Sequence, residues 1–422
     1  MTPLLRALLL STAAASTAKG VLFAVSALYF TTVIGLSPAT VGAVLTLAGG
    51  AGIATAFGAG RLCDLLGARG VLIAATAGQG VSLAVYCFSR TLIAFCLVAC
   101  LAAMTQAAQR TAQATLLAQH FTGPDRVATR ARLRVATNIF VGLGSALAAI
   151  ALTVGTARAY TIAMLAASAL VLVSLLPLRA IPPTPPHPAP PVSPRSPLRD
   201  RRYVTVAALN GVMTVQFGLL TVGMPLWVTT HTTAPAATVA LLLVLNTVLV
   251  TLFQIPASRL VPDVPAAGRT VLLAALLLLA SCLLYAAAAH GAALLAVTLL
   301  VLAVVAHTAG EILSEAGAWE LAFELADHRR AGAYQGISQT GFAAGTALAP
   351  ALTTATAITH GTPGWVVLGA LFVSAGAATH HIATRPHKSP PGRSAPTRPD
   401  RSSTPLPSHE PASRSGPGQR SE

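Results

Sequence analysis

The sequence predicts an all-α membrane protein with twelve transmembrane helices in two pseudo-symmetric six-helix bundles. Three observations predict it: the scarcity of charged residues, the length of the uncharged stretches and an internal repeat. Of 422 residues, 54% are hydrophobic and only 9% are charged, and the mean hydropathy is +0.70. Soluble domains carry about 25% charged residues, so this chain has too few to cover a surface in water. We therefore expect the lipid bilayer to surround most of the chain.

The uncharged stretches set the number of helices, since a spanning helix needs about 20 mostly apolar residues. Four stretches are long enough for one helix each: 70–89, 91–109, 135–157 and 159–178. Four more are long enough for two helices and contain a Gly or Pro breaker near the middle: 20–60, 203–258, 270–310 and 331–384. With a first helix that begins near Leu5 and contains Lys19, this predicts twelve spans.

Two bundles and two non-helical segments follow from composition. Residues 1–179 are expected to form the first bundle and residues 203–384 the second. Residues 180–202 are Pro-rich and predict an extended cytoplasmic linker. Residues 385–422 are rich in Pro, Ser and Arg, which predicts a disordered cytoplasmic tail.

Short matches relate the two predicted bundles. Residues 144–148 match 345–349 at an offset of 201, residues 60–62 match 258–260 at 198, and residues 71–75 match 271–275 at 200. The three offsets agree and fall at equivalent helices. Parallel repeats of this kind place a substrate site between the halves, near the middle of the bilayer.

Basic residues predict the orientation. With the N-terminus in the cytoplasm, sixteen arginines before the last span fall inside, while Arg90 and Arg158 fall outside. The basic residues from Arg385 onward also fall inside when the number of spans is even. We expect a multi-pass protein of the cell membrane with both termini cytoplasmic. The basic residues that give the formal net charge of +15 would then fix the topology and face anionic lipid headgroups.

Several other functions are not supported by the residues. The basic residues form no basic helix face with interleaved aromatics, so we expect no nucleic-acid binding. The five cysteines lie in or beside apolar segments without a metal-ligand spacing, so neither a metal site nor a cofactor is expected. The motifs of a nucleophile elbow or a zinc protease are missing, which argues against an enzyme. A transporter-like membrane sensor would need a further folded domain.

Ionisable residues inside the predicted spans are candidates for function. A charge at mid-helix costs roughly 2.5–3.5 kcal/mol on insertion scales, so each requires a reason. The candidates are Lys19, Arg110, His307 and Glu311, and the last two lie with Glu315 on one helix face. The repeat offset carries Arg110 onto Glu311, so we hypothesise that they bracket a cavity in which Glu311 exchanges protons. The alternative is a structural ion pair or snorkelling, which we favour for Glu315.

Neutral polar residues also recur in the spans. Asn138 and Gln339 share the offset of 201, which places them at equivalent points of the fifth and eleventh helices. They are candidates for lining the cavity. Hydrogen bonding between helices is the equally good alternative.

One loop motif carries a family resemblance. The major facilitator superfamily has Gly-x-Leu-Ala-Asp-Arg-x-Gly-Arg-Lys between helices two and three, and the stretch from Gly60 to Gly70 resembles it. The matching residues are Gly60, Asp64, Gly67 and Arg69, whereas Cys63, Leu65, Ala68 and Gly70 depart from the motif. Residues 258–263 are similar to the family's degenerate second copy.

This resemblance implies a monomeric secondary transporter that works by alternating access, with the motif as a cytoplasmic gate. Asp64 would cap the next segment or pair with an arginine such as Arg130 or Arg134; otherwise the motif is only a topology signal. Length and linker position are similar to the family's proton-coupled exporters of small organic molecules. The glycines of Gly142–Ala146 lack the proline that such exporters carry, so proton-coupled or facilitative uptake stays open as the alternative.

Overall fold

The computed structural model describes residues 2–89, 91–182 and 196–385, and all regular structure in this part is helical. Twelve of its helical segments are long and apolar enough to cross a membrane. The predicted fold class and number of spans are therefore confirmed. The described residues up to Thr384 form one compact unit. Most of the predicted linker and all but the first residue of the predicted tail lie outside the described residues.

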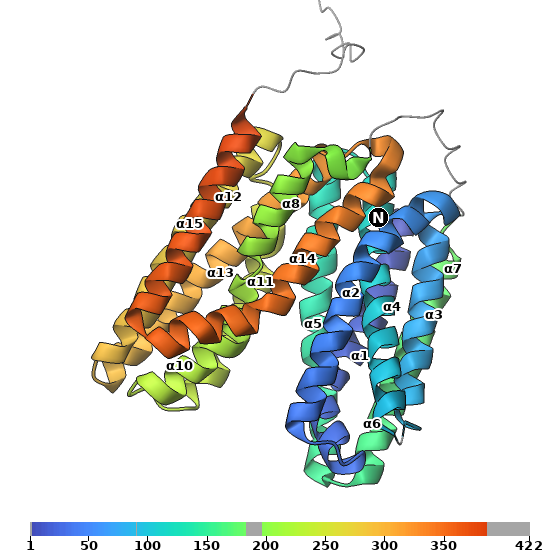
Figure 1. Cartoon of the computed structure of the whole chain (residues 1–422), viewed down its shortest axis with the longest axis horizontal. Helices are drawn as coiled ribbons and strands as arrows, with labels where there is room; N and C mark the ends of the chain where they lie inside the picture. The colour runs from blue at the N-terminus through green and yellow to red at the C-terminus, as the bar shows by residue number, and fades with distance from the viewer. Residues whose placement is uncertain (1, 90, 183–195, 386–422) are drawn as a thin grey trace, which may run out of the picture. The chain divides into compact units, whose positions relative to one another are not determined.

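The first six spans form the N-terminal half (Figure 1). Its helices are α1 (Pro3–Leu28, continued by a π-helical turn, Tyr29–Val33), α2 (Pro38–Leu66), α3 (Ala68–Tyr86), α4 (Leu92–His120), α5 (Pro124–Val154), and α6 with α7 (Ala157–Val173 and Leu175–Arg179).

The last six spans form the C-terminal half. A short 3-10 turn (Pro197–Arg199) leads into the seventh span, which is α8 (Arg201–Met213), α9 (Gln216–Gly218), a π-helical turn (Leu219–Gly223) and α10 (Met224–His231). The others are α11 (Thr238–Ser258), α12 (Val264–Ala287, with a 3-10 turn Ala288–His290), α13 (Ala293–Glu324), α14 (Ala331–Thr353, preceded by His328–Arg330 and followed by Thr354–Ile358) and α15 (Thr362–Thr384).

Hydroxyl and carboxylate caps set where several helices begin. Ser37 precedes Pro38 and its Oγ accepts the backbone N–H of Thr40 at 3.1 Å. Thr156 caps α6 in the same way, and Asp263 caps α12 by accepting the N–H of Ala266 at 2.7 Å. Each cap satisfies an N–H that the first helical turn leaves without a partner. The breaker near the middle of residues 20–60 is thus also a helix start signal.

The repeat has a physical counterpart in close helix contacts. A Cβ at Gly144 of α5 would overlap the carbonyl of Thr17 in α1, and a Cβ at Gly345 of α14 would overlap the carbonyl of Gly211 in α8. Because only glycine permits these approaches, the matching segments of the two halves hold equivalent helix pairs together.

The two halves meet at one end of the molecule. We call it the linker side, since the N-terminus, the end of α7 and the start of α8 lie there (Figure 1). One apolar cluster on this side contains Leu8 and Cys63 of the N-terminal half together with Trp319, Phe323 and Ala331 of the C-terminal half. The largest cluster of each half contains residues of that half alone. Towards the opposite end the halves diverge (Figure 1).

Several helices are longer than the uncharged stretches that predicted them. α4 continues past Arg110, and α5 begins at Pro124, so Arg126, Arg130 and Arg134 belong to the helix although we assigned them to a loop. Charges were treated as the ends of spans in the sequence. Helices run on beyond the bilayer core, and a charge that faces another helix or a cavity does not end them.

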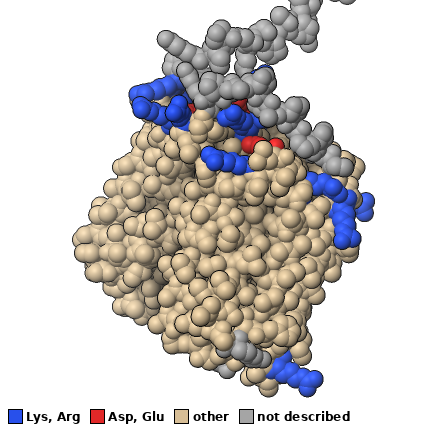
Figure 2. Space-filling model, turned by 45° about the vertical axis from the view of Figure 1, so that its right-hand side comes forward, with Lys and Arg blue, Asp and Glu red and all other residues tan. Residues whose placement is uncertain are grey.

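Figure 2 shows the distribution of charge on one face of the molecule. Lys and Arg side chains gather near one end, a smaller basic patch lies at the opposite end, and uncharged residues cover the rest of that face. This is the asymmetry from which the sequence predicts orientation. The side of the membrane on which the basic end lies stays a prediction.

Candidate functional site: a charged cavity between the halves

A cavity of about 320 Å³ lies among α1, α3, α4, α5, α6 and α7 of the N-terminal half and α13 and α14 of the C-terminal half. Leu8, Leu72, Leu117 and Leu178 line it and belong to the apolar cluster of the linker side. That cluster therefore forms part of the cavity wall. A cavity bounded by both halves changes shape when the halves move, which is the geometry that alternating access requires.

Three of the predicted cavity residues line it: Lys19, Arg110 and Gln339. Asn138 is half-buried on α5 outside the lining. His307 is fully buried in α13, and neither ring nitrogen has a hydrogen-bond partner among the described residues. The equivalence of Asn138 and Gln339 in the repeat therefore does not extend to the cavity wall.

Glu311 stands directly behind the wall of the cavity. It is 3% exposed, and its Oε1 forms an ion pair with Nη2 of Arg134 at 2.9 Å. Its Oε2 accepts a hydrogen bond from Nδ2 of Asn246 in α11 at 3.0 Å. Arg134 itself lines the cavity. Arg110 thus lies in the cavity wall, whereas Arg134 lies between Glu311 and the cavity. The exchange of protons by Glu311 stays a hypothesis.

The ion pair belongs to a row of contacts between the halves. Arg126, Arg130 and Arg134 stand four residues apart on α5, so they share one face of that helix. Arg126 pairs with Glu324 at 3.2 Å and Arg130 lies 5.5 Å from the ring centroid of Trp319, both on α13. The spacing of the three arginines was visible in the sequence. It was overlooked because all three were counted as loop residues.

Glu315 was expected to be structural, close to a helix end. The structure places it in the cavity wall together with Arg130 and Arg134. No hydrogen bond or ion pair holds its carboxylate among the described residues. Trp319 and Phe342, which the sequence did not single out, add aromatic surface to the same wall.

The motif residues contact the other half on the linker side. Oδ1 and Oδ2 of Asp64 accept the backbone N–H groups of Gly332 and Ala333, each at 2.8 Å. These are early N–H groups of α14, which lack partners within their helix. Of the two arginines suggested for Asp64, Arg134 pairs with Glu311, as described above. Asp64 therefore caps α14, a helix of the opposite half, whereas the segment that follows Asp64 in the chain was the one considered from the sequence.

The other motif residues shape this contact. A Cβ at Gly60 would overlap the carbonyl of Gly332, so the glycines let α2 and α14 touch. Gly67 has φ +83° between α2 and α3, a conformation that favours glycine. Arg69 donates from Nη2 to the carbonyl of Arg179 at 2.9 Å, which ties α3 to the end of α7 within the N-terminal half.

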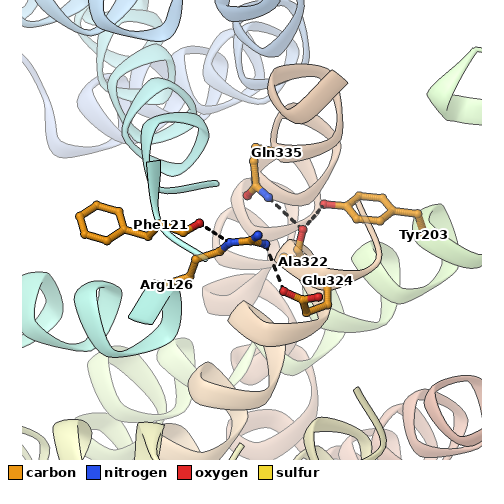
Figure 3. A network of polar contacts seen from close by, with 6 residues as sticks. All are labelled: Phe121, Arg126, Tyr203, Ala322, Glu324 and Gln335. Atoms are coloured by element: carbon orange, nitrogen blue, oxygen red, sulfur yellow. Dashed lines mark hydrogen bonds and ion pairs between the residues drawn. The ribbon is translucent and has the colours of Figure 1, made fainter. Parts of the chain in front are cut away.

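Figure 3 shows a second polar contact between the halves. Arg126, 5% exposed, donates from Nε to the carbonyl of Phe121 at 2.6 Å and pairs with Glu324. Behind Glu324, the carbonyl of Ala322 accepts from the hydroxyl of Tyr203 at 3.1 Å and from Nε2 of Gln335 at 2.9 Å. These hydrogen bonds therefore hold in position both the guanidinium of Arg126 and the end of α13 that carries Glu324.

Comparison with solved structures supports the fold. The chain is similar to the human organic anion transporter MFSD10 (TM-score 0.66, 14% identity, covering 90% of this chain and 99% of that one). It is similar to FucP, a major facilitator superfamily transporter, in the outward conformation (TM-score 0.73, 11% identity, covering 90% of this chain and 99% of that one). It is also similar to the proton:xylose symporter XylE (TM-score 0.66, 12% identity, covering 89% of this chain and 94% of that one). At these identities the likeness concerns the fold alone.

Sequence comparison defines the family. No curated protein is significantly similar to the chain. Residues 8–350, well over half of the chain, match the Major Facilitator Superfamily. With twelve candidate membrane spans and a charged cavity bounded by helices of both halves, the chain belongs to the major facilitator superfamily of secondary transporters.

Proposed function

We propose that this transporter exports a small organic molecule in exchange for protons, and that Glu311 is the group that exchanges them. The observation that carries the proposal is the ion pair between Glu311 and Arg134, which joins the two halves beside the cavity. An ion pair between parts that must separate is a natural place for a proton to act. Protonation removes the negative charge and with it the attraction.

The attraction that protonation of Glu311 removes is large enough to shift the equilibrium between the two conformations. Two unit charges about 4 Å apart attract with about 4 kcal/mol at an effective dielectric constant of 20. Each 1.4 kcal/mol changes an equilibrium tenfold, so loss of even half of this attraction shifts the ratio of the two conformations more than tenfold. Asn246 keeps a hydrogen bond to the protonated acid, so Glu311 is not left without a partner when Arg134 departs.

The orientation and conformation follow from the basic end of the molecule. We place the linker side in the cytoplasm of a cell with the chain in its plasma membrane. Because contacts between the halves are on the linker side, the structure then corresponds to a conformation closed to the cytoplasm. Release of Asp64 from α14 and of Arg134 from Glu311 would accompany the opposite conformation.

Export is the direction favoured by the resemblance to the family's exporters in length and linker position. Uptake by proton symport is the second candidate, and the likeness to a proton:xylose symporter favours it. The two differ in the pH gradient that drives accumulation. Proton exchange concentrates substrate in vesicles with an acidic lumen, whereas symport concentrates it in vesicles with an alkaline lumen.

The test is flux in proteoliposomes, screened with small amphipathic organic compounds under pH gradients of both signs. In Glu311→Gln we expect accumulation driven by the gradient to be lost while passive exchange of the compound continues. Glu324→Gln is the matched control, since it breaks the other ion pair between the halves outside the cavity. It should retain coupling. Full gradient-driven accumulation by Glu311→Gln would remove this residue from the mechanism.

A further inference from the structure

The cavity has more positive than negative charge in its wall. Lys19, Arg110, Arg130 and Arg134 line it, and Glu315 is the one carboxylate in the lining formed by the described residues. Glu311 offsets Arg134 from behind, and Glu315 lies with Arg130. Two positive charges are left without a counter-charge, those of Lys19 and Arg110.

These two cations come from two helices of the N-terminal half, α1 and α4, which a side-chain hydrogen bond from Gln113 to Thr12 links within the cavity wall. Neither has an ion pair or a hydrogen bond within the part of the chain that the structure describes. Lys19 has one polar contact, with Nζ 5.1 Å from the centroid of the Phe23 ring. Both side chains are partly exposed to the cavity, and they are close enough for their charges to repel one another.

Two unpaired cations inside a membrane protein are costly. A charge at mid-helix costs roughly 2.5–3.5 kcal/mol, and mutual repulsion adds to that. Such residues are rare, and they mark substrate or ion pathways. A bound anion would offset both costs at once, because it brings the missing counter-charge and accepts the hydrogen bonds that the ammonium and the guanidinium offer.

The rest of the wall suits a small organic anion better than an inorganic one. Gln106 and Gln109 of α4 line the same cavity as Arg110 and offer further hydrogen bonds, while Gln113 donates from Nε2 to Thr12 at 3.3 Å. Phe23, Trp319 and Phe342 provide aromatic surface for an apolar group. The volume of about 320 Å³ is at the lower end of the range of ligand pockets, about 300–1,000 Å³.

We propose that the transported molecule is an organic anion whose carboxylate, sulfonate or phosphonate group binds Lys19 and Arg110, with its apolar part against the aromatic residues of the wall. This inference rests on the proposed transport function and names its substrate class. It concerns binding, so it is tested without a proton gradient.

The experiment measures binding to the purified full chain in detergent at neutral pH, by thermal stabilisation and calorimetry. The probes are two series of equal size that differ in charge: indole-3-acetate, indole-3-acetamide and tryptamine, and benzoate, benzamide and benzylamine. We expect the acid of at least one series to bind about tenfold or more tightly than its amide, as charged hydrogen bonds require. The amine should bind more weakly still.

The variants separate charge from packing. Lys19→Gln and Arg110→Gln should each weaken binding of the acid by about tenfold to a hundredfold, with little change for the amide. Lys19→Arg and Arg110→Lys retain the charge and should restore most of the preference. Glu315→Gln removes the negative charge of the wall and should tighten binding of the acid.

Three outcomes overturn the proposal. They are equal binding of acid and amide, preference for the amine, and absence of binding by both acids at millimolar concentration. Failure of the proposed coupling is distinct from these. If Glu311→Gln transports normally while acids still bind Lys19 and Arg110, then the proton site is wrong and the substrate class stands. If gradient-driven flux is intact but charge does not matter for binding, then the substrate class is wrong.

Discussion

Replacing Asp64 by Asn tests how the linker side is held closed. Asp64 accepts two backbone N–H groups of α14 at 2.8 Å with a full negative charge. Hydrogen bonds to charged groups contribute about 1.5–3 kcal/mol each, and neutral ones about 0.5–1.5. Asparagine keeps one acceptor oxygen and turns its NH₂ towards the second N–H group. The substitution also removes the favourable interaction between the negative charge of the carboxylate and the positive end of the helix dipole of α14.

The loss amounts to about 2–3 kcal/mol, which raises the open population by about 30- to 150-fold. This population can be measured by the alkylation rate of a cysteine that is buried only when the halves touch. Ile337→Cys is suitable, since Ile337 is 6% exposed in a cluster against which Phe57 of the other half packs. With the native cysteines replaced, the rate is proportional to the open fraction when opening is fast.

Asp125→Asn is the matched control, because Asp125 is an exposed carboxylate on the same side of the molecule, in the first turn of α5. It should leave the alkylation rate at that of the parent. If Asp64→Asn also leaves the rate unchanged, the contact with α14 does not hold the linker side closed. The account of the motif as a gate would then be refuted.

Two further predictions concern stability and are checked by thermal unfolding of the purified chain in detergent. Gly144→Ala places a Cβ against the carbonyl of Thr17 and should destabilise by about 1–3 kcal/mol, as overpacking does. Gly142→Ala meets no atom within 4 Å and should be neutral or slightly stabilising; equal effects would contradict the proposed α1–α5 contact. Trp227→Phe removes the bond of 2.7 Å from Nε1 to the buried carbonyl of Tyr285 and should cost about 1–3 kcal/mol, while an unchanged melting temperature would show that this bond is dispensable.

Part of the candidate site could be predicted from the sequence. Lys19 and Arg110 were identified because a charge within an apolar stretch stands out against the cost of burying it. Asp64 was found through its motif. Arg130 and Arg134 were considered only as partners of Asp64 and not as cavity residues. An arginine near the end of a span has the same appearance in sequence whether it faces headgroups or a cavity. The position of Glu315 in the cavity wall was not apparent from the sequence for the same reason.

The sequence alone determined the helical fold class and the number of spans. It could do so because the bilayer imposes one rule along the chain: every spanning segment must be helical and apolar over a fixed length. That rule is local, so a spanning segment can be recognised without knowing which other helices contact it. The positive residues of the connections predict the orientation by a rule of the same kind.

Tertiary structure decided which polar groups meet. The partners of Asp64 are the backbone of Gly332 and Ala333, nearly 270 positions away, and backbone groups carry no signal in a sequence. Likewise, only the packing of α5 against α13 shows that Glu311 binds Arg134 and leaves Lys19 and Arg110 without a counter-charge. Pairing depends on the rotation and depth of each helix relative to the others, and hydropathy is nearly insensitive to both.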